Sequence, residues 1–241
     1  MTVPRLLVGL LLWAAMIRPV AAGTRAPDLI PLAPDFREYE WLQAYHVAVK
    51  DALLGDLHAT RCPVLVLPSF EREWATYVRT VEGRTEVVYV VMQKQLWYEM
   101  QRAAEATGLP ITPESEQREL ARLPRDVHRF SAPLSSSAAD VLDLVWKTML
   151  ARARAPERLG AGLDGTSYQF FRCPPGAECM AGTAWTPEPN TPAGQLAALA
   201  EAMHEHAGAF GDWLKRSELS LVQRANRLLK QIERTDSTPG R

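Results

Sequence analysis

The feature that most constrains the fold is a pair of β-type runs joined by a short turn. Residues 74–81 and 86–93 are rich in valine, tyrosine and threonine, and Glu82-Gly83-Arg84 lies between them. This pattern predicts a β-hairpin with a glycine-containing turn. Residues 87–92 (VVYVVM) are apolar on both faces, so we expect the second run to be a central strand that is covered on both sides.

Further strands and helices follow along the chain. Residues 62–67 form a short apolar run bounded by Pro63 and Pro68, which is typical of an edge or short strand because proline lacks the N–H of a ladder. Residues 166–172 and 179–186 are two more strand-like runs. Helical spacing of apolar residues predicts helices over 36–54, 96–107 and about 137–154, and a helical C-terminal part with two apolar stripes. This irregular order predicts an α+β fold with a mainly antiparallel sheet of about five strands and four to five helices.

Two polar patterns predict where helices begin. Asp35 is followed three residues later by Glu38, and Ser137 is followed three residues later by Asp140. Both spacings are those of a capping box, in which side chains bond the free N–H groups of the first turn. We therefore expect helices to start at these two points.

Residues 1–22 are predicted to be a secretory signal peptide. Arg5 supplies the positive charge, residues 6–17 are apolar, and Val20-Ala21-Ala22 places small residues before a cleavage point at Gly23. The alternative is an uncleaved anchor, but a spanning helix needs about 20 apolar residues. The first residue after the cleavage point is Gly23 and not a cysteine, so a lipid anchor is not expected.

The export signal defines the expected organisation. We expect a single globular domain over residues 23–241, located in the periplasm or secreted, with no transmembrane span after cleavage. Residues 1–22 hold two arginines and no acid, so residues 23–241 keep 25 basic and 28 acidic side chains. This balance offers no electrostatic basis for binding nucleic acid. The sequence indicates no cofactor.

Three cysteines are present, at positions 62, 173 and 179. We predict a Cys173–Cys179 disulfide, because an oxidising compartment favours pairing and the CPPGAEC loop between them is short. Cys62 precedes an apolar run and is interpreted as a buried thiol, with a reactive thiol as the alternative. The Cys-x5-Cys spacing is not that of a structural zinc site, so no metal is expected there.

Two motifs suggest chemistry that their surroundings do not support. The stretch GAGLDG at residues 160–165 has the G-x-G-x-x-G spacing, but the phosphate fingerprint needs a strand before it and a helix after it, and here the order is reversed. We expect residues 160–165 to form a turn.

Glu201 and His204 have a spacing used in di-iron bundles, but only one such pair occurs. His206 lies about 200° around the helix from His204, so we predict no metal site.

A hydrolase acting on an envelope polymer is the alternative function. No G-x-S-x-G elbow is present. Such an enzyme would use Asp164 with His128, His204 or a nearby Glu, although triads are recognised by geometry and spacing does not unite these residues. Ser69 and the serines at 135–137 are better interpreted as turn and helix-cap residues. The catalytic residues stay unknown.

The last predicted helix has a basic face. Its cations are Lys215, Arg216, Arg224, Arg227, Lys230 and Arg234, against Glu218 and Glu233. We interpret this as a solvated outer face, with an anionic membrane surface as the alternative.

Two stretches carry a resemblance to a family. PSFEREW at residues 68–74 precedes the hairpin, and Trp146 with Met149-Leu150 precedes GLDGTSYQF at residues 162–170. Together they resemble small exported proteins of Gram-negative bacteria that have no assigned function. The resemblance implies an envelope protein and assigns no catalytic residue. Our leading hypothesis is a non-enzymatic binding or interaction module, with an envelope or exported protein as a possible partner.

Overall fold

A computed structural model describes residues 29–32, 43–107, 118, 120–155 and 164–237. Within them the chain is an α+β protein with one antiparallel sheet, whose strand order is β1-β7-β6-β2-β3-β4-β5. The strands are β1 (Ile30–Pro31), β2 (Arg61–Pro68), β3 (Trp74–Val81), β4 (Arg84–Met92), β5 (Val127–Pro133), β6 (Thr166–Arg172) and β7 (Met180–Trp185). The helices are α1 (Gln43–Leu53), the 3₁₀ helix η2 (Leu57–Ala59), α2 (Leu96–Thr107), α4 (Ser136–Leu150), α5 (Pro192–Ala207) and α6 (Gly211–Asp236). The predicted signal peptide and the Asp35 capping box lie outside the described residues.

The predicted hairpin is formed by β3 and β4. Val81 pairs with Arg84, and the two residues between them, Glu82 and Gly83, have φ angles of 52° and 78°. Two consecutive positive φ values match the turn that follows the twist of a hairpin, and glycine adopts one of them without strain. Strand β4 lies between β3 and β5 and is buried on both faces, as expected.

Residues 62–67, expected to form an edge or short strand, do form a strand, but the edge position is wrong. Strand β2 lies in the middle of the sheet, between β6 and β3. Proline is accommodated there because the register shifts between Arg61 and Val64, and Cys62 takes a φ of 53° in this bulge. The Pro63 carbonyl accepts a hydrogen bond of 3.2 Å from the buried indole N–H of Trp146.

The described sheet has seven strands rather than about five, because two strands lack a clear sequence signal. Strand β5 pairs with β4 along its whole length, yet most of its side chains are exposed. An exposed edge strand needs no apolar alternation, so periodicity did not reveal it. Strand β1 is only two residues long and pairs with β7 through Ile30 and Pro31.

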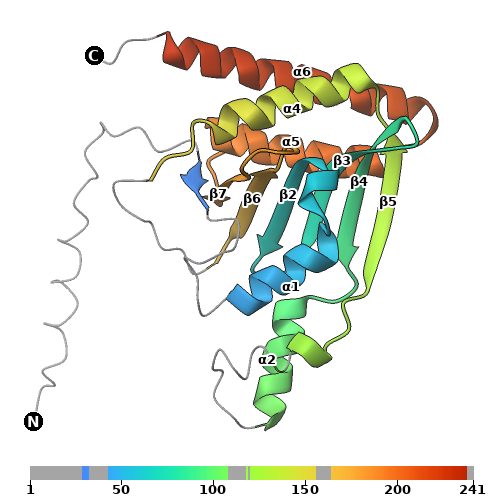
Figure 1. The fold of residues 1–241 in the computed structure, drawn as a ribbon, viewed down its shortest axis with the longest axis vertical. Helices are drawn as coiled ribbons and strands as arrows, with labels where there is room; N and C mark the ends of the chain where they lie inside the picture. Colours follow the sequence, from blue (N-terminus) through green and yellow to red (C-terminus); the bar gives the residue numbers. More distant parts are fainter. Residues whose placement is uncertain (1–28, 33–42, 108–117, 119, 156–163, 238–241) are drawn as a thin grey trace, which may run out of the picture.

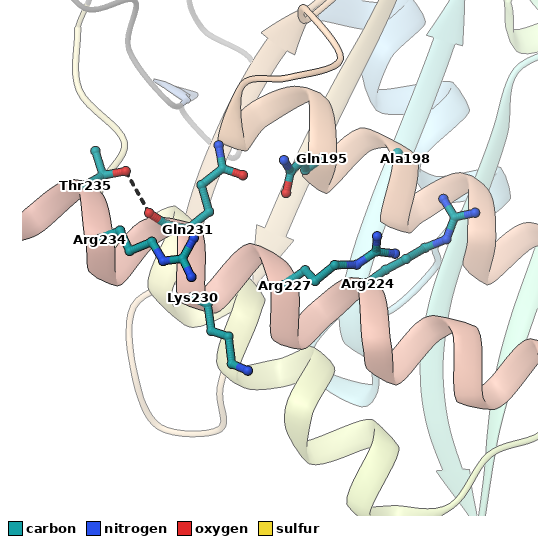
Figure 2. A pocket seen from close by; sticks show the side chains of 8 residues that line it. All are labelled: Gln195, Ala198, Arg224, Arg227, Lys230, Gln231, Arg234 and Thr235. Atoms are coloured by element: carbon teal, nitrogen blue, oxygen red, sulfur yellow. Dashed lines mark hydrogen bonds between the residues drawn. The ribbon is translucent and has the colours of Figure 1, made fainter.

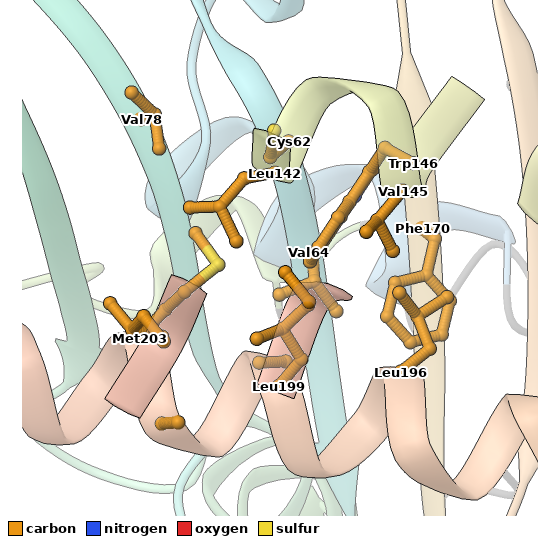
Figure 3. Close-up of a cluster of buried hydrophobic side chains, with 14 of the residues drawn as sticks. Cys62, Val64, Val78, Leu142, Val145, Trp146, Phe170, Leu196, Leu199 and Met203 are labelled. Atoms are coloured by element: carbon orange, nitrogen blue, oxygen red, sulfur yellow. The ribbon is translucent and has the colours of Figure 1, made fainter. Parts of the chain in front are cut away.

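Two apolar layers cover the sheet. Helices α4 and α5 pack on one face, and α6 packs on both of these helices (Figure 1). The core on this side includes Val64, Trp146, Phe170, Leu199 and Met203 (Figure 3). Helices α1 and α2 cover the other face over Leu65, Val88, Val90 and their neighbours. Odd and even residues of the same strands thus face different cores.

Two predicted helix boundaries can be compared in full, and the helix predicted over residues 36–54 can be compared only at its end, where α1 stops at Leu53. Helix α2 covers residues 96–107, as predicted. The cap of α4 is Ser135, whose hydroxyl accepts from the Ala138 N–H at 3.2 Å, so the predicted cap at Ser137 is wrong. The helix ends at Leu150 rather than near residue 154. No helix in the described ranges has both the length and the apolar character needed to cross a membrane.

Candidate functional site

Helix α5 starts at a well-defined cap. The Thr191 hydroxyl accepts a hydrogen bond of 3.0 Å from the Gly194 N–H, and Pro192 occupies the first turn, where a missing N–H costs nothing. Gly194 packs so closely on the preceding loop that an added Cβ would lie 2.0 Å from the Glu188 carbonyl oxygen. This contact fixes the start of α5 against the loop that follows β7.

Helix α6 is strongly amphipathic. Leu221, Ala225, Leu228 and Ile232 are buried and recur every three or four residues, which places them on one side of the helix. This stripe packs against α4 and α5. The flank of α6 beside α5 is free to carry polar side chains, because the core takes up only the buried stripe.

Helix α6 is hydrogen-bonded to α5 at one end and to the loop that precedes α5 at the other. Near the turn between the two helices, buried His206 has Nδ1 2.7 Å from the Ser217 hydroxyl and Nε2 3.0 Å from the Pro133 carbonyl. Burial lowers the pKa of this imidazole, so the ring is favoured in its neutral form. Toward the C-terminal end of α6, Gln231 Nε2 donates to the Asn190 carbonyl at 3.2 Å.

A groove of about 980 Å³ lies between the two helices. It is lined by Gln195, Ala198, Arg224, Arg227, Lys230, Gln231, Arg234 and Thr235 (Figure 2). All of the cations come from α6, whereas the α5 wall is an amide and a methyl group. Arg224 and Arg227 extend toward α5 in this view, and Thr235 is held by a 2.7 Å hydrogen bond to the Gln231 carbonyl.

Three of the four cations in this groove have no acidic partner among the described residues. No carboxylate lines the groove, and within the described ranges Arg224, Arg227 and Lys230 form no ion pair. Other arginines do have acidic partners: Arg172 lies 3.3 Å from Asp143, and Arg61 lies 2.7 Å from Asp140. Like charges one turn apart on a helix repel, and an anion between them would reduce this repulsion. The positive potential of the groove therefore favours binding of an anion.

The lining is rich in hydrogen-bond donors. The groove presents guanidinium, ammonium, amide and hydroxyl groups, and none of its lining residues is a His, Cys, Asp or Glu. Guanidinium groups stay charged near neutral pH and bind anionic oxygens through their N–H donors. All six cations of α6 are exposed, as expected for a solvated face, and four of the six also line the groove.

Glu201 and His204 belong to an aromatic cluster on α5, away from the groove lining. The Tyr168 hydroxyl donates to Glu201 at 3.1 Å, and His204 Nδ1 lies 3.9 Å from the other carboxylate oxygen. The imidazole of His204 stacks on Tyr89 with ring centres 3.9 Å apart, and Trp74 lies 5.5 Å away. Burial, followed by the charge of Glu201, raises the pKa of Tyr168. Among the described residues no three metal-ligating side chains gather.

The structure does not bring together the residues that a hydrolase would use. Asp164 is exposed at the start of β6, His128 is exposed on β5, and no hydrogen bond in the described part joins Asp164 to either His128 or His204. The Ser69 hydroxyl bonds both the carbonyl and the N–H of Gly165, at 2.9 and 3.0 Å. Ser69 therefore holds a turn, as expected. Of the 160–165 motif, only Asp164 and Gly165 lie within the described residues.

The cysteines are placed as expected. The sulfur atoms of Cys173 and Cys179 lie within disulfide-bonding distance and close the loop between β6 and β7. Cys62 is completely buried, and burial raises the pKa of its thiol. A buried, protonated thiol is a poor nucleophile, which favours the interpretation of Cys62 as structural.

Comparisons with known proteins name no relative: no family model, no curated protein and no solved structure matches this chain. The sequence signal for the groove was present in the spacing of Arg224, Arg227, Gln231 and Arg234, which repeats every three or four residues. Without the position of α5, that spacing did not distinguish a groove from an outer face.

Proposed function

We propose that this protein is a non-enzymatic binding module that takes an anionic group in the groove between α5 and α6. The observation that carries the proposal is the uncompensated pair Arg224 and Arg227 at a groove with no carboxylate in its lining. The anion is either free or carried by a partner from the same compartment. The groove is large enough for a small ligand, since such sites span about 300–1,000 Å³.

We also propose that the protein acts outside the cytoplasm, in the periplasm or as a secreted protein. The apolar run at residues 6–17 before Val20-Ala21-Ala22 supports this, as does the Cys173–Cys179 pair, because disulfides persist in oxidising compartments. The mass of the protein recovered from a producing cell tests this proposal. A chain beginning at Gly23 is expected, and a chain that retains residues 1–22 would contradict it.

Fluorescence anisotropy with labelled poly-glutamate tests the binding function. The variant R224Q/R227Q removes two charges from the groove, and K215Q/R216Q removes two charges from exposed positions of the same helix outside the groove lining. We expect the groove variant to lose affinity and the control variant to retain it. Equal loss in both variants would show attraction to overall charge instead of a site.

A further inference from the structure

We propose that the group bound in the groove is a phosphate, and that the natural ligand is a small elongated molecule with more than one phosphate group. This inference rests on the proposed binding function and specifies its ligand. It follows from the number, spacing and type of the cations on α6, and from the neutral groups on the opposite wall.

Arg224 and Arg227 match the charge of a phosphate better than that of a carboxylate. The two residues are three apart on α6, so their side chains leave the helix on neighbouring positions and line the same groove. Two adjacent guanidinium groups without an acidic partner offer two positive charges. A phosphate monoester carries a charge of about −1.5 to −2 at pH 7 and three acceptor oxygens, whereas a carboxylate carries one charge and two oxygens.

Guanidinium geometry strengthens this preference. Arginine presents its N–H donors in a planar fork that binds phosphate oxygens in a bidentate manner. Both Arg224 and Arg227 are exposed, so their donors are accessible from solvent. A phosphate between them satisfies one fork with one edge of the tetrahedron and leaves another edge for the second fork.

The length of the groove indicates more than one phosphate. From Arg224 to Lys230 the helix advances six residues, which corresponds to about 9 Å at 1.5 Å per residue. Lys230 lies beyond the arginine pair, lines the same groove and forms no ion pair within the described residues. Two basic positions separated along a 980 Å³ groove fit a ligand with two phosphates or a short phosphate chain.

The opposite wall suits the uncharged part of such a ligand. Gln195 and Ala198 on α5 present an amide and a methyl group, and neither adds charge. Gln231, which also lines the groove, donates a hydrogen bond to the Asn190 carbonyl, and this bond holds its side chain in place. A site with cations on one wall and neutral groups on the other orients a molecule that is anionic along one edge.

Isothermal titration with tripolyphosphate tests the inference, with citrate as the carboxylate comparison at the same ionic strength. We expect tripolyphosphate to bind and citrate to bind at least about tenfold more weakly, because each lost charge-assisted hydrogen bond weakens binding about tenfold or more. R224Q/R227Q is expected to reduce tripolyphosphate affinity by about tenfold or more, and K215Q/R216Q by less than about twofold. Thermal melting of both variants confirms that they are folded.

Flotation of vesicles distinguishes the two sources of phosphate. Vesicles of phosphatidylcholine containing phosphatidylglycerol present phosphate on a lipid surface, and tripolyphosphate presents it in solution. Binding of tripolyphosphate that depends on Arg224 and Arg227 supports the proposal. Binding that depends on these arginines but occurs only on vesicles would support the phosphate assignment and overturn the small-molecule ligand. Equal, groove-dependent affinity for citrate and tripolyphosphate would overturn the phosphate inference but leave the binding function intact. No groove-dependent binding of polyglutamate, citrate or either phosphate probe would overturn both.

Discussion

The two sides of the sheet differ in whether a charged side chain has partners within the protein. On the side of α1 and α2, Glu73 is completely buried, and its carboxylate accepts hydrogen bonds from the Tyr45 hydroxyl at 2.8 Å, the Leu96 N–H at 2.9 Å and the Trp97 N–H at 3.0 Å. On the side of α5 and α6, Arg224 and Arg227 are exposed and have no carboxylate nearby in the groove.

The difference separates a stabilising charge from a binding charge. Glu73 caps the first turn of α2, so its negative charge meets the positive end of a helix dipole and free N–H groups. Burial, followed by the charge of Glu73, raises the pKa of Tyr45, and the phenol therefore stays protonated as a donor. The Glu73 carboxylate thus accepts its three hydrogen bonds from groups inside the protein. Arg224 and Arg227 instead keep their donors available for a molecule from outside.

The largest expected effect is on Glu73. Glu73→Leu leaves three donors without their acceptor in a buried position, and we expect the free energy of unfolding to fall by about 4 kcal/mol. Urea denaturation measures this change. Glu71→Leu, two residues away and exposed, is the control and should alter stability by less than about 0.5 kcal/mol. Similar losses of unfolding free energy in both variants would contradict the stabilising role of the buried carboxylate.

The next effect is a pH dependence from His46, which lies on the same side. Burial lowers the pKa of His46 from 6.5 to about 4. The unfolded chain takes up the proton first as pH falls, so the stabilising contribution is complete above about pH 6.5 and is lost as pH falls through about 4. The loss approaches about 3 kcal/mol.

Unfolding measured between pH 7 and pH 4 checks the His46 prediction. We expect His46→Leu to reduce the fall in stability, because this variant has no imidazole to protonate. His58→Leu changes an exposed histidine on η2 and should leave the pH dependence as it is. An unchanged slope in His46→Leu would contradict the prediction.

A smaller effect on stability is expected for His206, which lies on the side of α5 and α6. His206→Ala removes the contacts to Ser217 and to the Pro133 carbonyl, and we expect a loss of about 2 kcal/mol in unfolding free energy. Hydrogen exchange should show the loosening around α5, α6 and the end of β5. His204→Ala removes a half-exposed ring and should lower the free energy of unfolding by less than His206→Ala does. The reverse order would show that the groove helices do not depend on this contact.

The smallest effect on stability is expected for the groove arginines themselves. R224Q/R227Q removes two exposed charges that stabilise nothing, so the free energy of unfolding should change by less than about 0.5 kcal/mol. A slight gain is the favoured direction, because repulsion between neighbouring cations is relieved. Urea denaturation at low salt measures it. A loss above about 1 kcal/mol would mean that these side chains support the fold, and the contrast with Glu73 would fail.

Sequence patterns predicted the elements whose own residues carry the signal. The hairpin of β3 and β4 was predictable because valine-rich runs flank a turn that requires positive φ, and α2 because its apolar spacing ends at Gly108 and Pro110. Strand β5 was not predictable, because an edge strand with exposed side chains shows no period. The central place of β2 was also missed, since Pro63 argues for an edge until the bulge at Cys62 is seen.

The candidate site follows the same division. The sequence by itself determined that α6 is amphipathic, that its cations recur every three or four residues, and that Cys173 and Cys179 are close enough along the chain to pair. Only the tertiary structure decided which cations face another helix. That depends on how α5 crosses the sheet, on where His206 attaches α6 to α5, and on where Gln231 attaches α6 to the loop before α5. Local spacing specifies a helix face, whereas a groove is a property of two helices and needs the contacts that set their separation.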